Sequence, residues 1–289
     1  KLAFEMLATL CSWLPEDRQL DLAGDGEYAC QTLLRKLPDA VVFTGPMTMN
    51  AALYAKPGQR AGRGRPRLKG RRLRSPEGRA RTGTWRKHVV RLYGRDVTIL
   101  IQTWTCLWYT VTGEREVRVV LTRDPKGRWQ DRAYFCTDPR RSAEQILARY
   151  SHRWNLEVAF ASAKQTLGLE DPRNGWWRRV HGRRADTKKA GPKPRGNIGR
   201  KAVERTVPFI FMTYGIVAIW FFKHGNAERE VERQRKTKPW YGLKREAAYT
   251  DMLAALRRSL WGVRISRYPS LRPHRTKIVD LVQGLAYAA

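Results

Sequence analysis

The chain has few cysteines, and none of the four stands in a C-x-x-C pair. Its five histidines are scattered, so the sequence offers no zinc-site signature. The wide spacing of Cys11, Cys30, Cys106 and Cys136 is typical of free thiols in a reducing cytoplasm. No GxxxxGK[ST] or GxGxxG motif and no Ser/His/Asp arrangement occurs, so ATP hydrolysis and dinucleotide chemistry have no support.

Acidic side chains are also scarce. The 289 residues carry 57 Lys and Arg against 26 Asp and Glu, a formal net charge of +31. An excess of this size indicates a polyanionic partner, with nucleic acid the first candidate. Hydrophobic residues make up 42%, which allows a sizeable core and excludes wholesale disorder. Eleven tryptophans argue against a small ribosomal or histone-like binder.

Long hydrophobic runs are missing apart from Val207–Phe222. This run is shorter than the roughly 20 residues that span a bilayer, so we expect a buried core helix rather than a membrane or interfacial segment. No signal peptide precedes it, and we expect a cytoplasmic, nucleoid-associated protein without a membrane partner. A start at Lys1 instead of Met suggests that an N-terminal part is missing.

The first 46 residues predict an α/β unit. Residues 1–13 have the spacing of a helix, and a short strand ends near Asp25. A helix over Glu27–Lys36 and an apolar strand over Ala40–Thr44 follow. Strand, helix and strand within so few residues indicate a parallel pair.

The middle of the chain changes character twice. Residues 56–83 are rich in Arg, Gly and Pro, which predicts a mobile basic loop. Between Thr84 and Thr137, turn signals separate four β-branched and aromatic runs, which indicates an antiparallel β insertion. The expected strands are His88–Tyr93, Val97–Tyr109, Glu116–Thr122 and Arg132–Cys136.

A long helix is expected next. Ser142 and Gln145 form an S-x-x-Q capping box, and the pattern runs to Gly168 without a breaker. A second basic stretch covers 172–205, ahead of the Val207–Phe222 helix. We then expect a charged linker, an amphipathic helix near Glu246–Trp261 and a terminal helix near Lys277–Ala288. We expect four parts: the first part of the core over 1–46, the basic loop with the β insertion over 47–137, the second part of the core over 138–224, and the C-terminal helices over 225–289.

Four side chains of the predicted 143–167 helix share one narrow face: Tyr150, Arg153, Glu157 and Lys164. At 100° per residue they fall within about 60° of one another. Beside this face, Leu147, Trp154, Val158 and Ala161 are expected to pack on a sheet. His152 points away and is expected to be non-catalytic. Taken alone, Arg153 and Glu157 also fit an ordinary i,i+4 ion pair on a solvated face.

The spacing Y-x2-R-x3-E-x6-K, here YSHRWNLEVAFASAK, resembles the YREK motif of bacterial insertion-sequence transposases of the DDE type. The segment GDGEYA resembles the region that holds the second catalytic aspartate of that family. The resemblance implies an α/β, RNase H-like core, with the antiparallel β insertion between the second-aspartate strand and the glutamate helix. It covers about residues 15–165.

The resemblance also implies a chemistry: metal-dependent cleavage and strand transfer of DNA at the ends of an insertion sequence. Asp25 and Glu157 would be the catalytic metal ligands for two Mg²⁺ ions, with Mn²⁺ able to substitute. Arg153 and Lys164 would bind phosphates beside the scissile bond, and Tyr150 would contact the DNA backbone. The partners would be double-stranded DNA of transposon ends and target, with a homodimer forming on DNA.

The chain departs from the family at the first aspartate. That residue lies upstream of the first helix in the family, and here the helix is residues 1–13. Asp21 is no substitute, because four strand residues separate it from Asp25 by about 13 Å. We therefore expect the chain alone to be inactive or nearly so. The alternative function is a non-catalytic DNA-binding remnant, or a repurposed transposase.

The two basic stretches are expected to bind DNA through released counterions, against the plainer interpretation of solvated loops. The residues that carry this expectation are Arg63, Arg65, Arg67, Arg71, Arg72, Arg178 and Arg179. Trp176 and Trp177 are expected to anchor their loop in a core; stacking on an unpaired base is the alternative.

Overall fold

The computed structural model describes residues 2–58, 67–170, 179–180, 183–184, 196–266, 278, 281–282 and 286. The chain divides into two compact units, Lys1–Leu156 and Glu157–Ala289. The four-part division expected from the sequence stays a prediction.

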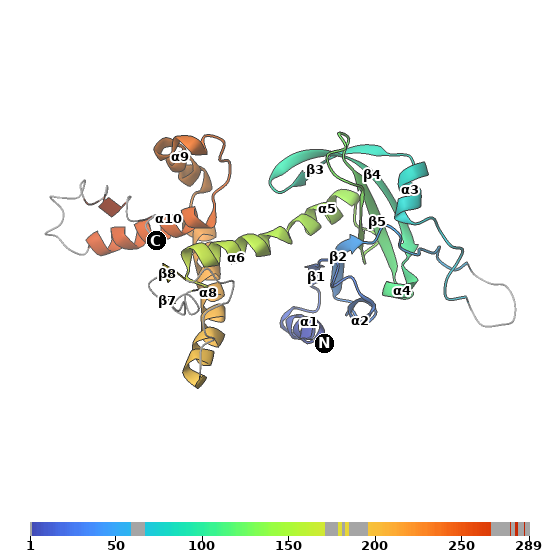
Figure 1. Ribbon diagram of the computed structural model, residues 1–289, viewed down its shortest axis with the longest axis horizontal. Helices are drawn as coiled ribbons and strands as arrows, with labels where there is room; N and C mark the ends of the chain where they lie inside the picture. The colour runs from blue at the N-terminus through green and yellow to red at the C-terminus, as the bar shows by residue number, and fades with distance from the viewer. Residues whose placement is uncertain are drawn as a thin grey trace. The chain divides into compact units, whose positions relative to one another are not determined.

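The first unit is built on one mixed sheet with the strand order β1-β2-β6-β5-β4-β3 (Figure 1). Its strands are β1 Leu20–Ala23, β2 Val41–Met47, β3 Arg86–Leu92, β4 Arg95–Leu107, β5 Glu116–Arg123 and β6 Arg132–Cys136. The expected parallel pair is confirmed, with Leu20 opposite Val41. The four β-branched runs are confirmed as strands that pair antiparallel. They do not form a separate sheet, because β6 pairs directly with β2.

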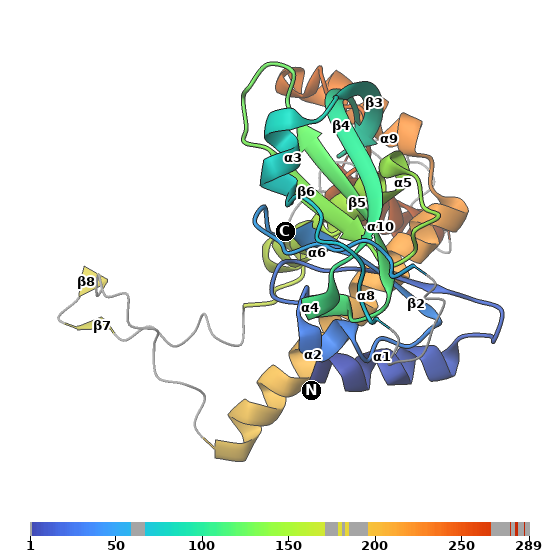
Figure 2. The ribbon, with the colours of Figure 1, turned by 90° about the vertical axis from the view of Figure 1, so that its right-hand side faces the viewer.

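Helices cover both faces of this sheet, and α3 and α5 lie on opposite sides of it (Figure 2). The helices of the unit are α1 Leu2–Trp13, α2 Gln31–Leu34, α3 Pro76–Thr82, α4 Tyr109–Thr112 and α5 Ala143–Ser151. One core joins Phe43 and Phe135 to Leu7, Leu34 and Ala80 from the first three helices. The other core lies under α5 and includes its Ile146 and Leu147.

Two expectations for the first unit are wrong in part. The predicted Glu27–Lys36 helix is only the four-residue α2, because turns occupy the residues before it. The predicted loop 56–83 contains α3, which Ser75 caps by accepting a hydrogen bond from the Gly78 N–H at 3.2 Å. The backbone near Arg71 also pairs with the segment around Ala55, at 2.9 Å. Local hydrogen bonding therefore orders the described part of this basic stretch.

The long helix expected over 143–167 is broken. Its first piece, α5, begins with the predicted capping box, which is confirmed. The second piece, α6 Trp154–Thr166, begins after a turn at His152 and Arg153. The Ser151 hydroxyl donates to the Ala148 carbonyl at 2.7 Å, and the Arg153 N–H reaches back only three residues, to Tyr150. Such back-bonding competes with the helical ladder and accounts for the break.

The second unit is helical in most of its described part, with α8 Gly196–His224, α9 Ala227–Thr237, η1 Pro239–Tyr241 and α10 Tyr249–Ser266, plus the short strands β7 Arg179–Val180 and β8 Arg183–Arg184. Helix α10 crosses α8 (Figure 1), and Tyr249 stacks on Tyr214 with ring centroids 4.1 Å apart. The helix expected near Glu246–Trp261 is confirmed as α10. The expected charged linker is instead α9, capped by Asn226. Most of the expected terminal helix 277–288 lies outside the described residues.

The expectation that Val207–Phe222 is a buried core helix is wrong for much of its length. Ile210, Val217 and Phe221 are buried, whereas Phe209 and Phe222 are 64% and 91% exposed. Within the described residues, Arg200–His224 is the one helical segment long and apolar enough to cross a membrane. Length and composition alone are weak grounds for a membrane span, because core helices of soluble proteins share them.

Candidate active site

Asp25 follows β1 in a tight turn that its own carboxylate stabilises. Its Oδ1 accepts a hydrogen bond from the Glu27 N–H at 3.1 Å, and the Tyr28 N–H donates to the Asp25 carbonyl. Gly24, directly before it, is buried against Phe43, and a Cβ there would lie 2.8 Å from the phenylalanine ring. The glycine therefore permits the close packing that fixes the end of the strand, and Asp25 is left half-buried beyond it.

Asp21, on the same strand, has partners that the sequence did not predict. Its carboxylate lies 3.1 Å from a guanidinium nitrogen of Arg141 and 2.8 Å from one of Arg149. Arg149 belongs to α5, and Arg141 lies in the loop before it. Asp21 is thus a link between β1 and the helix that leads into the motif.

Arg153 lies beside the same strand. A cavity of about 260 Å³ is lined by residues from β1, β2, the end of α5, the turn after it and the start of α6, namely Asp21, Leu22, Ala23, Thr44, Arg149, His152, Arg153 and Leu156. The motif arginine thus lies beside the strand that Asp25 follows. His152 lines the same cavity, and its expected non-catalytic role stays a prediction.

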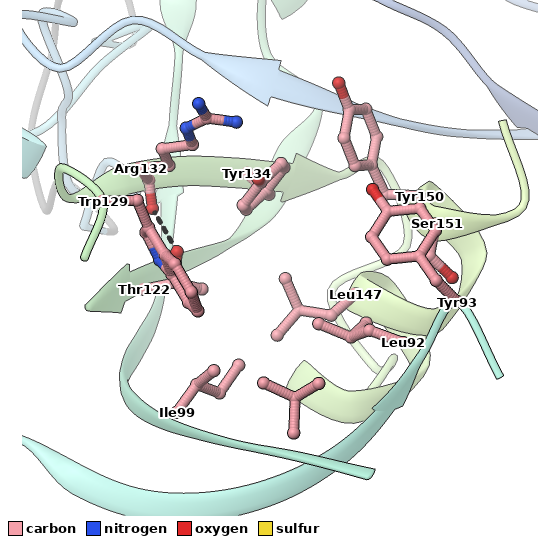
Figure 3. Close-up of a pocket in the computed structure, with 11 residues that line it drawn as sticks. Leu92, Tyr93, Ile99, Thr122, Trp129, Arg132, Tyr134, Leu147, Tyr150 and Ser151 are labelled. Atoms are coloured by element: carbon pink, nitrogen blue, oxygen red, sulfur yellow. Dashed lines mark hydrogen bonds between the residues drawn. The ribbon is translucent and has the colours of Figure 1, made fainter. Parts of the chain in front are cut away.

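Tyr150 packs inside the first unit. Its ring lies 4.8 Å from that of Tyr134, measured between centroids, and the Arg153 guanidinium lies 5.9 Å from the Tyr150 ring centroid. Burial raises the pKa of the Tyr134 phenol, so this neighbour stays neutral. Tyr150 also lines a mainly apolar cavity of about 420 Å³ between the sheet and α5 (Figure 3).

The aromatic surroundings of this cavity extend to the start of α6. Figure 3 shows Tyr93 beside Tyr150, with Leu147 and Leu92 across the cavity from Tyr134. Trp154 contacts Tyr93 edge to face at 6.5 Å but remains 48% exposed. The expectation that Trp154 packs the motif helix onto a sheet is therefore wrong for much of this side chain, whereas for Val158, in the second unit, it stays a prediction.

Glu157 and Lys164 belong to the second unit. Glu157 is exposed in the first turn of α6. Lys164, in its last turn, forms an exposed ion pair with Glu170 at 2.9 Å. Because Asp25 lies in the first unit and Glu157 in the second, a metal site shared by them stays a prediction. Among the residues that the structure describes, no group of three Asp, Glu, His or Cys side chains is placed to hold a metal ion.

The expected DNA-binding arginines divide into described and undescribed residues. Arg67, Arg71 and Arg72 are exposed, as a contact with DNA requires. Arg179 lies in the two-residue strand β7. Outside the described residues lie Arg63, Arg65, Trp176, Trp177 and Arg178. All four cysteines are free, as expected from their spacing.

Comparison with protein families gives a match to the transposase DDE domain over residues 4–180, more than half of the chain. No curated protein and no solved structure matches the chain. The match spans the whole sheet of the first unit, the turn that holds Asp25, and both α5 and α6. The chain therefore belongs to the family of transposase DDE domains.

Proposed function

We propose that the chain is the catalytic region of an insertion-sequence transposase of the YREK group, with an RNase H-like core. Its reaction would be metal-dependent cleavage and strand transfer of DNA phosphodiesters. The observation that best supports this is local: Arg153, the arginine of the motif, shares a cavity with β1, and Asp25 follows that strand.

The donor chemistry of the two carboxylates fits a hard divalent cation, because Mg²⁺ prefers oxygen ligands. Asp25 is suited to this role because the turn fixes its half-buried carboxylate and engages one oxygen with the Glu27 N–H. Asp25 and Glu157 would hold the metal ions, which when bound supply activation of the attacking oxygen and stabilisation of the leaving one. Arg153 and Lys164 would orient the flanking phosphates, and Tyr150 would contact the backbone.

DNA is the proposed partner, held by the net charge of +31 and by the exposed arginines of the 67–72 segment. Guanidinium groups suit phosphate oxygens because they donate in a planar fork. We also propose that two copies assemble on paired transposon ends.

The proposal is tested on the gene product that contains this sequence, with labelled duplex DNA carrying the element's ends. We expect Mg²⁺-dependent cleavage that Asp25→Asn and Glu157→Gln each reduce by more than roughly a hundredfold, the upper range for loss of an outer-shell residue. Binding to DNA in EDTA should stay unchanged in both variants. A protein that binds DNA equally well but never cleaves it would support the non-catalytic alternative.

A further inference from the structure

The second unit contains a cationic cavity that the proposed active site does not use. It has a volume of about 440 Å³ and lies where the end of α8, the start of α9 and one side of α10 meet. Three arginines line it, Arg229 and Arg233 from α9 and Arg258 from α10, together with a single carboxylate, Glu230. Three guanidinium groups around one carboxylate leave an excess of positive charge in the cavity wall.

Glu230 holds two of these arginines in place. It is 4% exposed, accepts a hydrogen bond from Arg233 at 3.1 Å, and forms an ion pair with Arg258 of the neighbouring helix. A buried carboxylate needs such partners, since an unpaired buried charge is costly. Each guanidinium has five N–H donors, and a single carboxylate cannot engage all of them. The pairing therefore fixes the arginines and leaves the cavity cationic.

Arg229 adds a cation that nothing in this pairing requires. It lies four residues before Arg233 on the same face of α9, where like charges repel. Its side chain is exposed, and its backbone N–H donates at 2.9 Å to Oδ1 of Asn226, the residue that caps the helix. An anion in the cavity would offset the repulsion, and the positive end of the α9 dipole would favour it.

Aromatic rings also line the cavity. Trp220 and His224 line it from the last turns of α8, with ring centroids 5.9 Å apart. Arginines and aromatic rings in one cavity suit a phosphate together with its sugar or base, and suit a bare anion less well. The very basic composition of the chain indicates the same class of ligand.

From these contacts we propose that this cavity binds a backbone phosphate of DNA, as a site separate from Asp25 and Glu157. The inference rests on the proposed function only in that the chain must bind DNA. Arg229 would contact the phosphate directly, while Glu230 would position Arg233 and Arg258 for it.

The test measures binding of the full chain to fluorescent duplex DNA in EDTA, over a series of salt concentrations. Arg229→Gln should weaken binding and lower the slope of log K against log salt by about one, because one fewer phosphate is neutralised. Lys236→Gln is the matched control: it removes one charge from the same helix, at an exposed residue paired with Glu232 outside the cavity. The control should leave the slope unchanged.

A second pair of variants inserts charge. Ser259 lines the cavity and is exposed, so Ser259→Glu should weaken DNA binding while Ser259→Gln does not. Circular dichroism should show every variant folded. Competition with inorganic phosphate distinguishes a site for any anion from a site for DNA. If the cavity binds DNA, low millimolar phosphate should leave the binding of the duplex unchanged. The inference is overturned if Arg229→Gln has the same DNA affinity and salt slope as Lys236→Gln, and if Ser259→Glu binds DNA as well as Ser259→Gln. No DNA binding by the unmodified chain would overturn it and the proposed function together.

Discussion

Arg149 on α5 lies 2.8 Å from Asp21 on β1, and Arg141 reaches the same carboxylate at 3.1 Å from the loop before the helix. These contacts join residues more than a hundred positions apart. They attach the start of the motif region to the strand that Asp25 follows. Asp21 therefore has a structural role in the first unit.

Asp21→Asn should destabilise the first unit. The substitution keeps the shape of the side chain but removes the charge that pairs with the partly buried Arg141 and the exposed Arg149, at a cost of about 1 kcal/mol. Urea unfolding measures the difference. Asp39→Asn is the control, because Asp39 pairs with Arg115 through a fully exposed carboxylate and should give no measurable change. Equal stabilities of the two variants would contradict the role given to Asp21.

Ser142→Ala should lower stability by about 1 kcal/mol. The Ser142 hydroxyl accepts a hydrogen bond from the Gln145 N–H at 3.2 Å, and the Gln145 side chain accepts one from the Ser142 N–H at 3.0 Å. Thermal unfolding provides the comparison, with Ser142→Thr as the variant that keeps an acceptor. A loss of the same size in the threonine variant would show that the hydroxyl does not cap α5.

Asp124 should make stability depend on acid. Arg128 donates to its carboxylate at 2.8 Å, and this hydrogen bond holds the pKa of Asp124 at about 2, below its ordinary 3.8. A carboxyl whose pKa is lower in the folded state stabilises the fold above its unfolded value. Its contribution then disappears as the pH falls from about 4 to about 2.

Unfolding midpoints of the wild type and Asp124→Asn between pH 7 and pH 2 check this. The two should differ at neutral pH and converge near pH 2. A difference that stays constant down to pH 2 would mean that the ionised carboxylate is not what stabilises this turn.

The exposed arginines of the 67–72 segment should contribute to DNA affinity without supporting the fold. Replacing Arg71 and Arg72 together by Gln should lower the salt slope of DNA binding by about two, one for each phosphate that is no longer neutralised. The variant should unfold at the same temperature as the wild type, since both side chains are exposed. An unchanged slope with the same stability would leave this segment without a role in binding.

How far the sequence predicts this structure depends on the range of the interactions. The strands of the sheet are predictable because β-branched and aromatic runs are local signals. The capping box is predictable for the same reason. Helix α9 is missed because its sequence, AEREVERQRKT, has little apolar content, and its buried Glu230 and Gln234 are held by residues of other segments.

In the candidate site, too, local signals are predictable from the sequence and interactions between distant segments are not. The motif is visible as a spacing, but the break between α5 and α6 is not, because SHRW contains neither proline nor glycine. The break depends on the Ser151 hydroxyl, with Tyr150 packed on Tyr134 and Trp154 against Tyr93. In the same way, no local pattern pairs Asp21 with Arg149.

A two-metal site to which both Asp25 and Glu157 contribute is the core of the proposed chemistry, and Mn²⁺ binding to the protein on DNA tests it. Electron paramagnetic resonance of the free ion measures that binding. We predict that Asp25→Asn and Glu157→Gln each weaken Mn²⁺ binding by at least roughly tenfold, and that the double variant adds little to either single one. Asp39→Asn should bind Mn²⁺ like the wild type. Unchanged binding in both single variants, or reductions that simply add, would contradict a shared site.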